Sequence, residues 1–109
     1  MDGFENFIHG LPHWSISVCL EYKGDIVASI ILSPVLEELF LAEKGSGTWL
    51  NEQRVRVSGR TGLDQMVFAT DLPGSSRGVL ATQIKDLARV APSAGGIRGL
   101  GAVGLDMAY

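Results

Sequence analysis

The strongest constraint on the fold is a ten-residue stretch, His13 to Tyr22, in which apolar side chains alternate with small or polar ones. A period of two is typical of a β-strand, because successive side chains point to opposite faces of a sheet. A Lys-Gly-Asp turn follows at 23–25, and an apolar, β-branched run occupies 26–32. Two such runs joined by a short glycine turn predict a β-hairpin.

Further short runs predict that the first half of the chain continues as an antiparallel meander. The expected strands are 36–42, 48–50 and 54–58, and the turns between them are 45–47 and 51–53. A pair of glutamates in the first of these runs leaves a helix open as an alternative there. In the last run arginines alternate with valines, so the valines are expected to face inward.

The pattern changes after a polar segment at 59–64, and the second half predicts strands alternating with helices. A short apolar run at 66–70 is consistent with a buried strand. Between 78 and 91, apolar residues recur at steps of four, three and four, which is typical of one helix face. Ser75 or Ser76 could cap this helix, and Pro92 ends it. A short strand at 97–100 and a second helix at 102–109 are expected to follow.

Composition and charge exclude several classes of protein. With 109 residues, 46% of them hydrophobic, the chain suits one small domain rather than a disordered tail. A net charge of −3 provides no basic surface for nucleic acid, so no nucleic acid partner is expected. No apolar stretch reaches the roughly 20 residues that cross a bilayer, so no membrane association is expected.

The single cysteine, Cys19, allows no intrachain disulfide. Together with an acidic N-terminus that differs from a secretory signal, this predicts a cytoplasmic protein. Because Cys19 lies on the alternating strand and no base motif accompanies it, we expect a buried structural thiol rather than a nucleophile.

Two short motifs have more than one interpretation. His9 and His13 are four residues apart and could share zinc on a helix, but Gly10 and Pro12 favour turn histidines. Residues 99–104 read Gly-x-Gly-x-x-Gly, as in a dinucleotide site. The acidic residue that such a site needs about 20 positions later is missing, which favours a tight turn before a closely packed helix.

The order of several segments is informative beyond these patterns. Residues 2–13 read Asp-Gly-Phe-Glu-Asn-Phe-Ile-His-Gly-Leu-Pro-His. They resemble the tail of the Asp-Pro-Ile-Asp-Gly-Thr-x-Asn-Phe-x-His signature of the inositol monophosphatase family, which comprises magnesium-dependent, lithium-sensitive phosphatases. Further segments that resemble this family in order are 34–35, 38–40, 42–51, 57–58, 69–72, 74–77, 96–98, 101–102 and 105–106.

This resemblance implies a layered α/β fold, the α+β sandwich of the inositol monophosphatase and fructose-1,6-bisphosphatase type. Residues 1–109 would form a partial domain from the middle of the family fold. Residues 1–58 would belong to an antiparallel sheet, and 66–109 would begin a second α/β layer. Such a piece is expected to expose sheet edges and apolar faces, and the family suggests a possible homodimer.

The resemblance also implies phosphate monoester hydrolysis of an inositol-phosphate-like substrate by water activated by Mg²⁺. Asp2 takes the position of a family aspartate that binds the metal and lies near the substrate. The residues implied to contact the phosphorylated substrate are Asp2, Gly3, Phe4, Ser75, Ser76, Gly101, Ala102 and Val103. Those at positions 3 and 4 would do so through backbone N–H groups, and those at 101–103 through the backbone bordering the inositol ring.

Departures from the family pattern predict that this chain alone is inactive or nearly so. Phe4 stands where the signature has a threonine whose hydroxyl orients the attacking water. The other carboxylate motifs of the family are absent, and one carboxylate cannot hold two or three magnesium ions. The alternative function is that of a non-catalytic remnant, or an interaction piece that pairs with a full-length relative.

Overall fold

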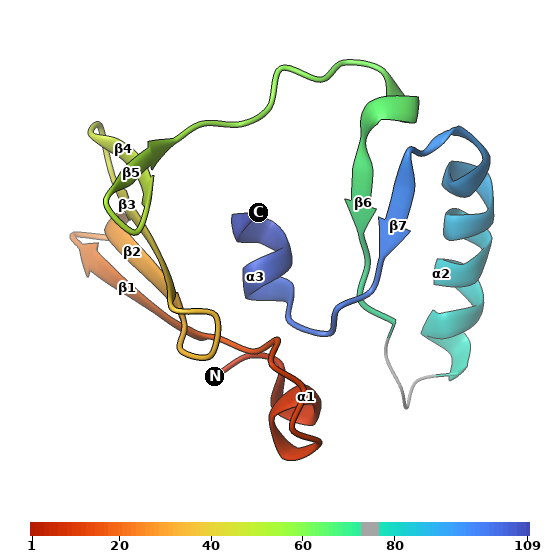
Figure 1. Ribbon diagram of the computed structural model, residues 1–109, viewed down its shortest axis with the longest axis horizontal. Coiled ribbons are helices and arrows are strands. Elements are labelled where there is room, and N and C mark those ends of the chain that lie inside the picture. Colours follow the sequence, from red (N-terminus) through yellow and green to blue (C-terminus); the bar gives the residue numbers. More distant parts are fainter. Residues whose placement is uncertain (73–76) are drawn as a thin grey trace. The chain divides into compact units, whose positions relative to one another are not determined.

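The structure, a computed structural model, describes residues 1–72 and 77–109, leaving out the side chains of residues 77–79 (Figure 1). The chain divides into two compact units. One contains Met1–Val57 together with Ala102–Tyr109, and the other contains Ser58–Gly101. The sequence-based division put residues 1–58 in one part and 66–109 in the other. In the structure, the last helix instead packs with the first strands.

The first unit contains a five-stranded antiparallel sheet whose spatial order is the sequence order, β1-β2-β3-β4-β5. Its strands are β1 (Ile16–Tyr22), β2 (Asp25–Ser33), β3 (Glu38–Glu43), β4 (Gly47–Leu50) and β5 (Gln53–Val55). The meander expected from the alternating pattern is therefore confirmed.

Backbone conformation explains two of the connections in this meander. Lys23 and Gly24, between β1 and β2, have φ of 53° and 86°. Positive φ at both central residues is the type I′ geometry that matches the twist of a hairpin. Glu37, one of the two glutamates that left a helix open, has φ of 55° in the turn before β3.

Strand β5 is shorter than the alternating arginines and valines predict. Its last residue, Val55, pairs with Thr48 of β4, and β4 has four residues. The chain leaves the sheet after Val55, although β4 continues by one more residue, Gly47. The prediction that Val57 faces inward is wrong, because its side chain is 97% exposed.

A short helix near the N-terminus, α1 (Phe4–Ile8), is absent from the sequence-based expectation. Gly10 and Pro12 disfavour a helix at 9–13, but α1 ends before both of them. Asn6 Nδ2 donates a hydrogen bond of 2.7 Å to the carbonyl of His13, which fastens the helix to the segment leading into β1.

The hydrophobic core of the first unit lies between the sheet and α3 (Val103–Ala108), which runs alongside it (Figure 1). Phe40 pairs with Ile31 and Leu50 on neighbouring strands, so these three residues lie on one face of the sheet. Ala102 and Leu105 pack against this face and are completely buried. The expected helix near 102–109 is confirmed, and it closes the core.

The opposite face of the sheet is apolar and open. Strand register brings together on this face residues Ile16, Val18, Leu20, Ala28, Ile30, Leu32, Leu39 and Leu41. Val18 and Leu20 are 54% and 61% exposed. The expectation of exposed apolar faces is confirmed.

Cys19 is exposed, so the prediction of a buried thiol is wrong. The reason is that β1 is an edge strand whose residues are all exposed.

The second unit contains a parallel pair, β6 (Val67–Ala69) and β7 (Gly96–Arg98), joined through α2 (Arg77–Val90). A short 3₁₀ segment, η1 (Leu63–Gln65), precedes β6. Another, η2 (Ala91–Ser93), follows α2. A parallel pair needs a crossover, and the helix provides it. Thus the strand, helix and strand predicted here are confirmed, while Ser75 and Ser76 lie outside the described residues.

Across the residues that the structure describes, no helix combines the length and the apolar character needed to cross a membrane.

The first prediction concerns Leu105, whose side chain is completely buried under the sheet. Leu105→Ala should lower the free energy of unfolding by about 2–5 kcal/mol, because it removes buried methyl groups and leaves a cavity. Urea unfolding of the chain measures this. Met107→Ala is the matched control on the same helix, since Met107 is 82% exposed, and it should change stability by less than about 0.5 kcal/mol. Equal effects of the two variants would contradict this packing.

The second prediction concerns Tyr109, whose hydroxyl donates a hydrogen bond to the Glu38 carboxylate and whose ring lies edge-on to Phe40. Partial burial, with the hydrogen bond and the negative charge of Glu38, raises the pKa of Tyr109 to about 12. Folding therefore favours the protonated phenol. This stabilisation is complete below the ordinary pKa of about 10 and is lost as the pH rises towards 12.

Phenolate absorbance during an alkaline titration, with Tyr109→Phe subtracted, measures this ionisation. We expect stability to fall over the same pH range in the wild type and to fall less in Tyr109→Phe. Ionisation of Tyr109 near its ordinary pKa would contradict the contact with Glu38.

Candidate functional site

The carboxylate of Asp2 is held between two distant parts of the first unit. Asp2 and Ser15 form an isolated antiparallel bridge, with backbone N–O distances of 2.8 and 3.0 Å. Oδ1 accepts a hydrogen bond of 3.0 Å from the Gly3 N–H, and Oδ2 accepts one of 2.5 Å from the Gly104 N–H. The second contact joins residues that are 102 positions apart, so only the folded chain forms this arrangement.

Glycine is required at position 3 for two reasons. Gly3 has φ of +77°, a conformation that other residues rarely adopt. A Cβ atom at this position would also lie 2.9 Å from the His13 carbonyl oxygen and 3.0 Å from Trp14 Cα. This glycine lets the Asp2 loop pack directly on the segment before β1. Phe4 follows as the first residue of α1 and is 58% exposed.

Gly104 allows α3 to approach the same carboxylate closely. A Cβ at Gly104 would lie 3.2 Å from Asp2 Oδ2, 3.2 Å from Ser17 Oγ and 3.3 Å from Ser15 Oγ. Ser15 is completely buried, and its hydroxyl has no hydrogen-bond partner in the part of the chain that the structure describes. The site therefore contains a small polar cluster of Asp2, Ser15, Ser17 and the Gly104 N–H.

The close packing of a helix near residues 99–104 was predicted, but Ser15, Ser17 and the hydrogen bond from Gly104 to Asp2 were not. The available signals were weak: two serines at alternate positions of a strand, and a glycine inside a predicted helix. Both patterns are typical of close backbone approach, but neither identifies what approaches.

The two histidines that are four residues apart each have their own carboxylate. His13 Nε2 lies 3.7 Å from Asp106 Oδ1, and the two side chains are only 17% and 7% exposed. His9 Nε2 lies 4.0 Å from Glu5 Oε2, with both side chains largely in solvent. His13 thus faces α3, and His9 pairs within its own helical segment.

The structure brings together only some of the substrate-contacting residues that the resemblance implies. Asp2 and Gly3 meet the start of α3, where Ala102 is buried and Val103 is 42% exposed, through the Gly104 N–H. Gly101 has φ of +76° and belongs to the second unit. Ser75 and Ser76 lie outside the described residues.

Asp2 could provide one ligand for a magnesium ion. Mg²⁺ prefers hard oxygen ligands, and an ionised carboxylate offers about four acceptor positions. The two N–H donors use two of these acceptor positions, so others on the same carboxylate are not taken by these bonds. Among the described residues, however, no group of three or more His, Cys, Asp or Glu side chains is placed to hold a metal ion.

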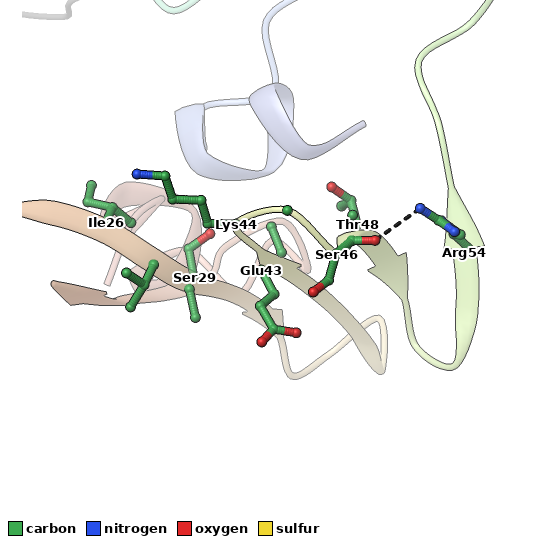
Figure 2. Close-up of a pocket in the computed structure, with 12 residues that line it drawn as sticks. Ile26, Ser29, Glu43, Lys44, Ser46, Thr48 and Arg54 are labelled. Carbon is green, nitrogen blue, oxygen red and sulfur yellow. Dashed lines mark hydrogen bonds between the residues drawn. The ribbon is translucent and has the colours of Figure 1, made fainter. Parts of the chain in front are cut away.

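Apart from the Asp2 cluster, the first unit has a hollow of about 590 Å³ by β2, β3 and β4. Lys44 and Arg54 are among the residues that line it (Figure 2). Both cations already have partners. Lys44 Nζ lies 3.1 Å from Asp25 Oδ2, and Arg54 Nη2 donates a hydrogen bond of 2.9 Å to the Ser46 carbonyl. Glu43 also lines this hollow. It therefore offers little net positive charge to a phosphate, and the Asp2 cluster remains the candidate site.

Comparison with known proteins identifies the family. The model of the inositol monophosphatase family matches residues 1–109. An inositol-1-monophosphatase of Rhizobium meliloti is 41% identical over 109 residues, covering 100% of this chain and 41% of that protein. A protein of Pseudomonas aeruginosa named Nus factor SuhB is 38% identical over 111 residues, again covering 100% of this chain and 41% of the relative.

Solved structures agree with the sequence comparison. The extragenic suppressor protein suhB of Bartonella henselae matches with a TM-score of 0.93 and 44% identity, covering 99% of this chain and 42% of that one. A Thermotoga maritima IMPase matches with a TM-score of 0.87 and 35% identity, covering 99% and 40%. The layered α/β fold is thus confirmed, and the chain spans about two fifths of the length of these relatives. Because the family model matches all of residues 1–109, the chain belongs to the inositol monophosphatase family.

Proposed function

We propose that this chain carries part of the site of a magnesium-dependent phosphatase that hydrolyses a phosphate monoester such as an inositol phosphate. The observation that supports this most directly is the placement of Asp2. Its carboxylate is oriented by two backbone N–H groups, in a chain that matches the phosphatase family throughout. When bound, Mg²⁺ would neutralise phosphoryl oxygens and lower the barrier to attack by water.

Each residue of the site has a distinct role in this proposal. Asp2 supplies one oxygen ligand, and Gly104 orients that ligand by donating to Oδ2. Gly3 allows the tight turn that presents the carboxylate. By the family resemblance, the backbone of Gly101, Ala102 and Val103 would border the sugar ring, and Gly3 and Phe4 would border the phosphate. The resemblance also assigns a substrate contact to Ser75 or Ser76, which lie outside the described residues.

We further propose that residues 1–109 form part of a larger domain, and that the chain alone has little or no activity. Several oxygen ligands are needed to hold Mg²⁺, and the described residues include no group of three or more His, Cys, Asp or Glu side chains that could provide them. Phe4 also lacks the hydroxyl that would orient water. Without these groups, phosphate release from inositol 1-phosphate by the 109-residue chain should equal the buffer rate at any Mg²⁺ concentration.

The third prediction tests Asp2 in a longer protein that joins this sequence to the missing segments of a family relative. Asp2→Asn should lower kcat/KM for inositol 1-phosphate by at least ~100-fold, because losing a ligand should cost no less than losing a group that supports one. Asp25→Asn is the control, since Asp25 pairs with Lys44 at the surface and should leave activity unchanged. Retention of full, magnesium-dependent activity by Asp2→Asn would contradict the proposed ligand.

The fourth prediction tests position 4 in the same longer protein. Phe4→Thr should raise kcat by about tenfold or more, because a positioned group that moves or orients a proton contributes about 10²–10⁴-fold. Phe4→Val is the matched control, since valine has the shape of threonine without its hydroxyl. An equal kcat in both variants would show that the hydroxyl has no role here.

A second candidate function is that of an interaction piece, which the open apolar face of the sheet favours. Val18, Leu20 and Leu41 on this face are 54%, 61% and 38% exposed. Such a surface suits a protein partner, whether a full-length relative or a second copy. Size-exclusion chromatography of the chain, alone and mixed with the Rhizobium relative, tests this function: a monomer in both cases would argue against it.

Some relatives carry the name Nus factor SuhB, among them the Pseudomonas protein at 38% identity. A role like the one that this name describes would belong to the interaction function. The expected absence of a nucleic acid partner, and the cytoplasmic location, stay predictions.

A further inference from the structure

We propose that His13 and Asp106 are positioning residues that hold the Gly104 N–H against the carboxylate of Asp2. The ion-pair geometry links the segment that supports Asp2 to the helix that carries Gly104. The catalytic importance of this link rests on the proposed phosphatase function, whereas the link itself can be measured without metal or substrate.

The contact between Asp2 and Gly104 depends on where the first turn of α3 lies. A hydrogen bond weakens once the donor and acceptor move beyond about 3.2 Å, and a short helix of six residues has little stability of its own. Its position must therefore come from tertiary contacts. Leu105 anchors it in the core, but apolar burial is non-directional and does not by itself fix rotation or sliding of the helix.

The hydrogen bond of Tyr109 to Glu38 gives direction at the far end of α3, and the pair formed by His13 and Asp106 gives it near Gly104. At 3.7 Å, the contact between Nε2 and Oδ1 is longer than a hydrogen bond and is an electrostatic attraction when the imidazole is protonated. Both side chains are mostly shielded from water, which weakens screening by salt. Asp106 lies two residues after Gly104, and its N–H donates to the Ala102 carbonyl, so its position is tied to the start of α3.

His13 is equally tied to the other side of the site. Its carbonyl oxygen accepts the hydrogen bond from Asn6 Nδ2 and lies against Gly3, the residue after Asp2. Two residues further along, Ser15 forms the backbone bridge with Asp2. One residue therefore contacts the Asp2 loop through its backbone and α3 through its side chain.

The fifth prediction tests this link by NMR of the complete ¹⁵N-labelled chain, without metal. The hydrogen bond to an ionised carboxylate should move the amide proton of Gly104 downfield, and Asp2→Asn measures how much of this displacement depends on the charge. His13→Ala and Asp106→Asn should each remove roughly half of that displacement, and the double variant should add little, because the residues act as one pair.

His9→Ala is the matched control, because the exposed His9–Glu5 pair has the same chemistry four residues away. It should leave the Gly104 amide unchanged. The Tyr109 amide, which donates to the Leu105 carbonyl in the last turn of α3, reports whether the helix persists. We expect it to keep its wild-type position in every variant.

Two results would overturn the inference. An unchanged Gly104 amide in both His13→Ala and Asp106→Asn would show that the pair does not position this group. Loss of the wild-type Gly104 and Tyr109 signals together would show that the pair merely holds the helix folded. Since neither measurement uses Mg²⁺ or substrate, failure of the phosphatase proposal would leave these signals as expected and would appear only in the activity assays.

Discussion

The packing of α3 onto the five-stranded sheet is the interaction on which the first unit depends. Leu105 and Ala102 are completely buried, and Phe40 beneath them is 6% exposed. This contact joins the last residues of the chain to strands near its start, so it creates both the core and the site. Without it, the Asp2 carboxylate would keep the Gly3 N–H but lose the Gly104 N–H, which belongs to α3.

Small residues make this close packing possible. Gly104 faces Asp2, Ser15 and Ser17, and a Cβ there would lie 3.2–3.3 Å from an oxygen of each, so these side chains or the helix would have to shift. The cost is a buried serine hydroxyl at position 15 with no partner among the described residues. A buried hydroxyl of this kind destabilises by about 1–3 kcal/mol, so the cluster has not been optimised for stability. That arrangement is typical of a functional site, where geometry takes precedence over stability.

The two faces of the sheet differ in a way that matters for function. One face is covered by α3 and carries the core, while the other presents apolar residues from three strands to solvent. The chain spans about two fifths of its relatives, and the described residues include no group of three or more His, Cys, Asp or Glu side chains that could hold a metal ion. Together with the open face, these facts agree with a partial phosphatase domain. They agree equally with a chain whose role is to bind a partner.

Local patterns in the sequence were sufficient for most of the secondary structure. Alternation over His13 to Tyr22 and the turn at Lys23 and Gly24 predicted the first hairpin, because side-chain period and turn conformation are local properties. The period of the second half likewise predicted α2 and the strands around it. Segment order identified the family, and with it Asp2 as the candidate ligand.

Long-range contacts decided the rest. The exposure of Cys19 depends on β1 lying at the sheet edge. The pairing of His13 with Asp106, and of Asp2 with Gly104, joins residues that no local pattern relates. The sequence by itself determined which elements form and which family they belong to. Only the tertiary structure decided which side chains meet, because those contacts arise when α3 packs against the sheet.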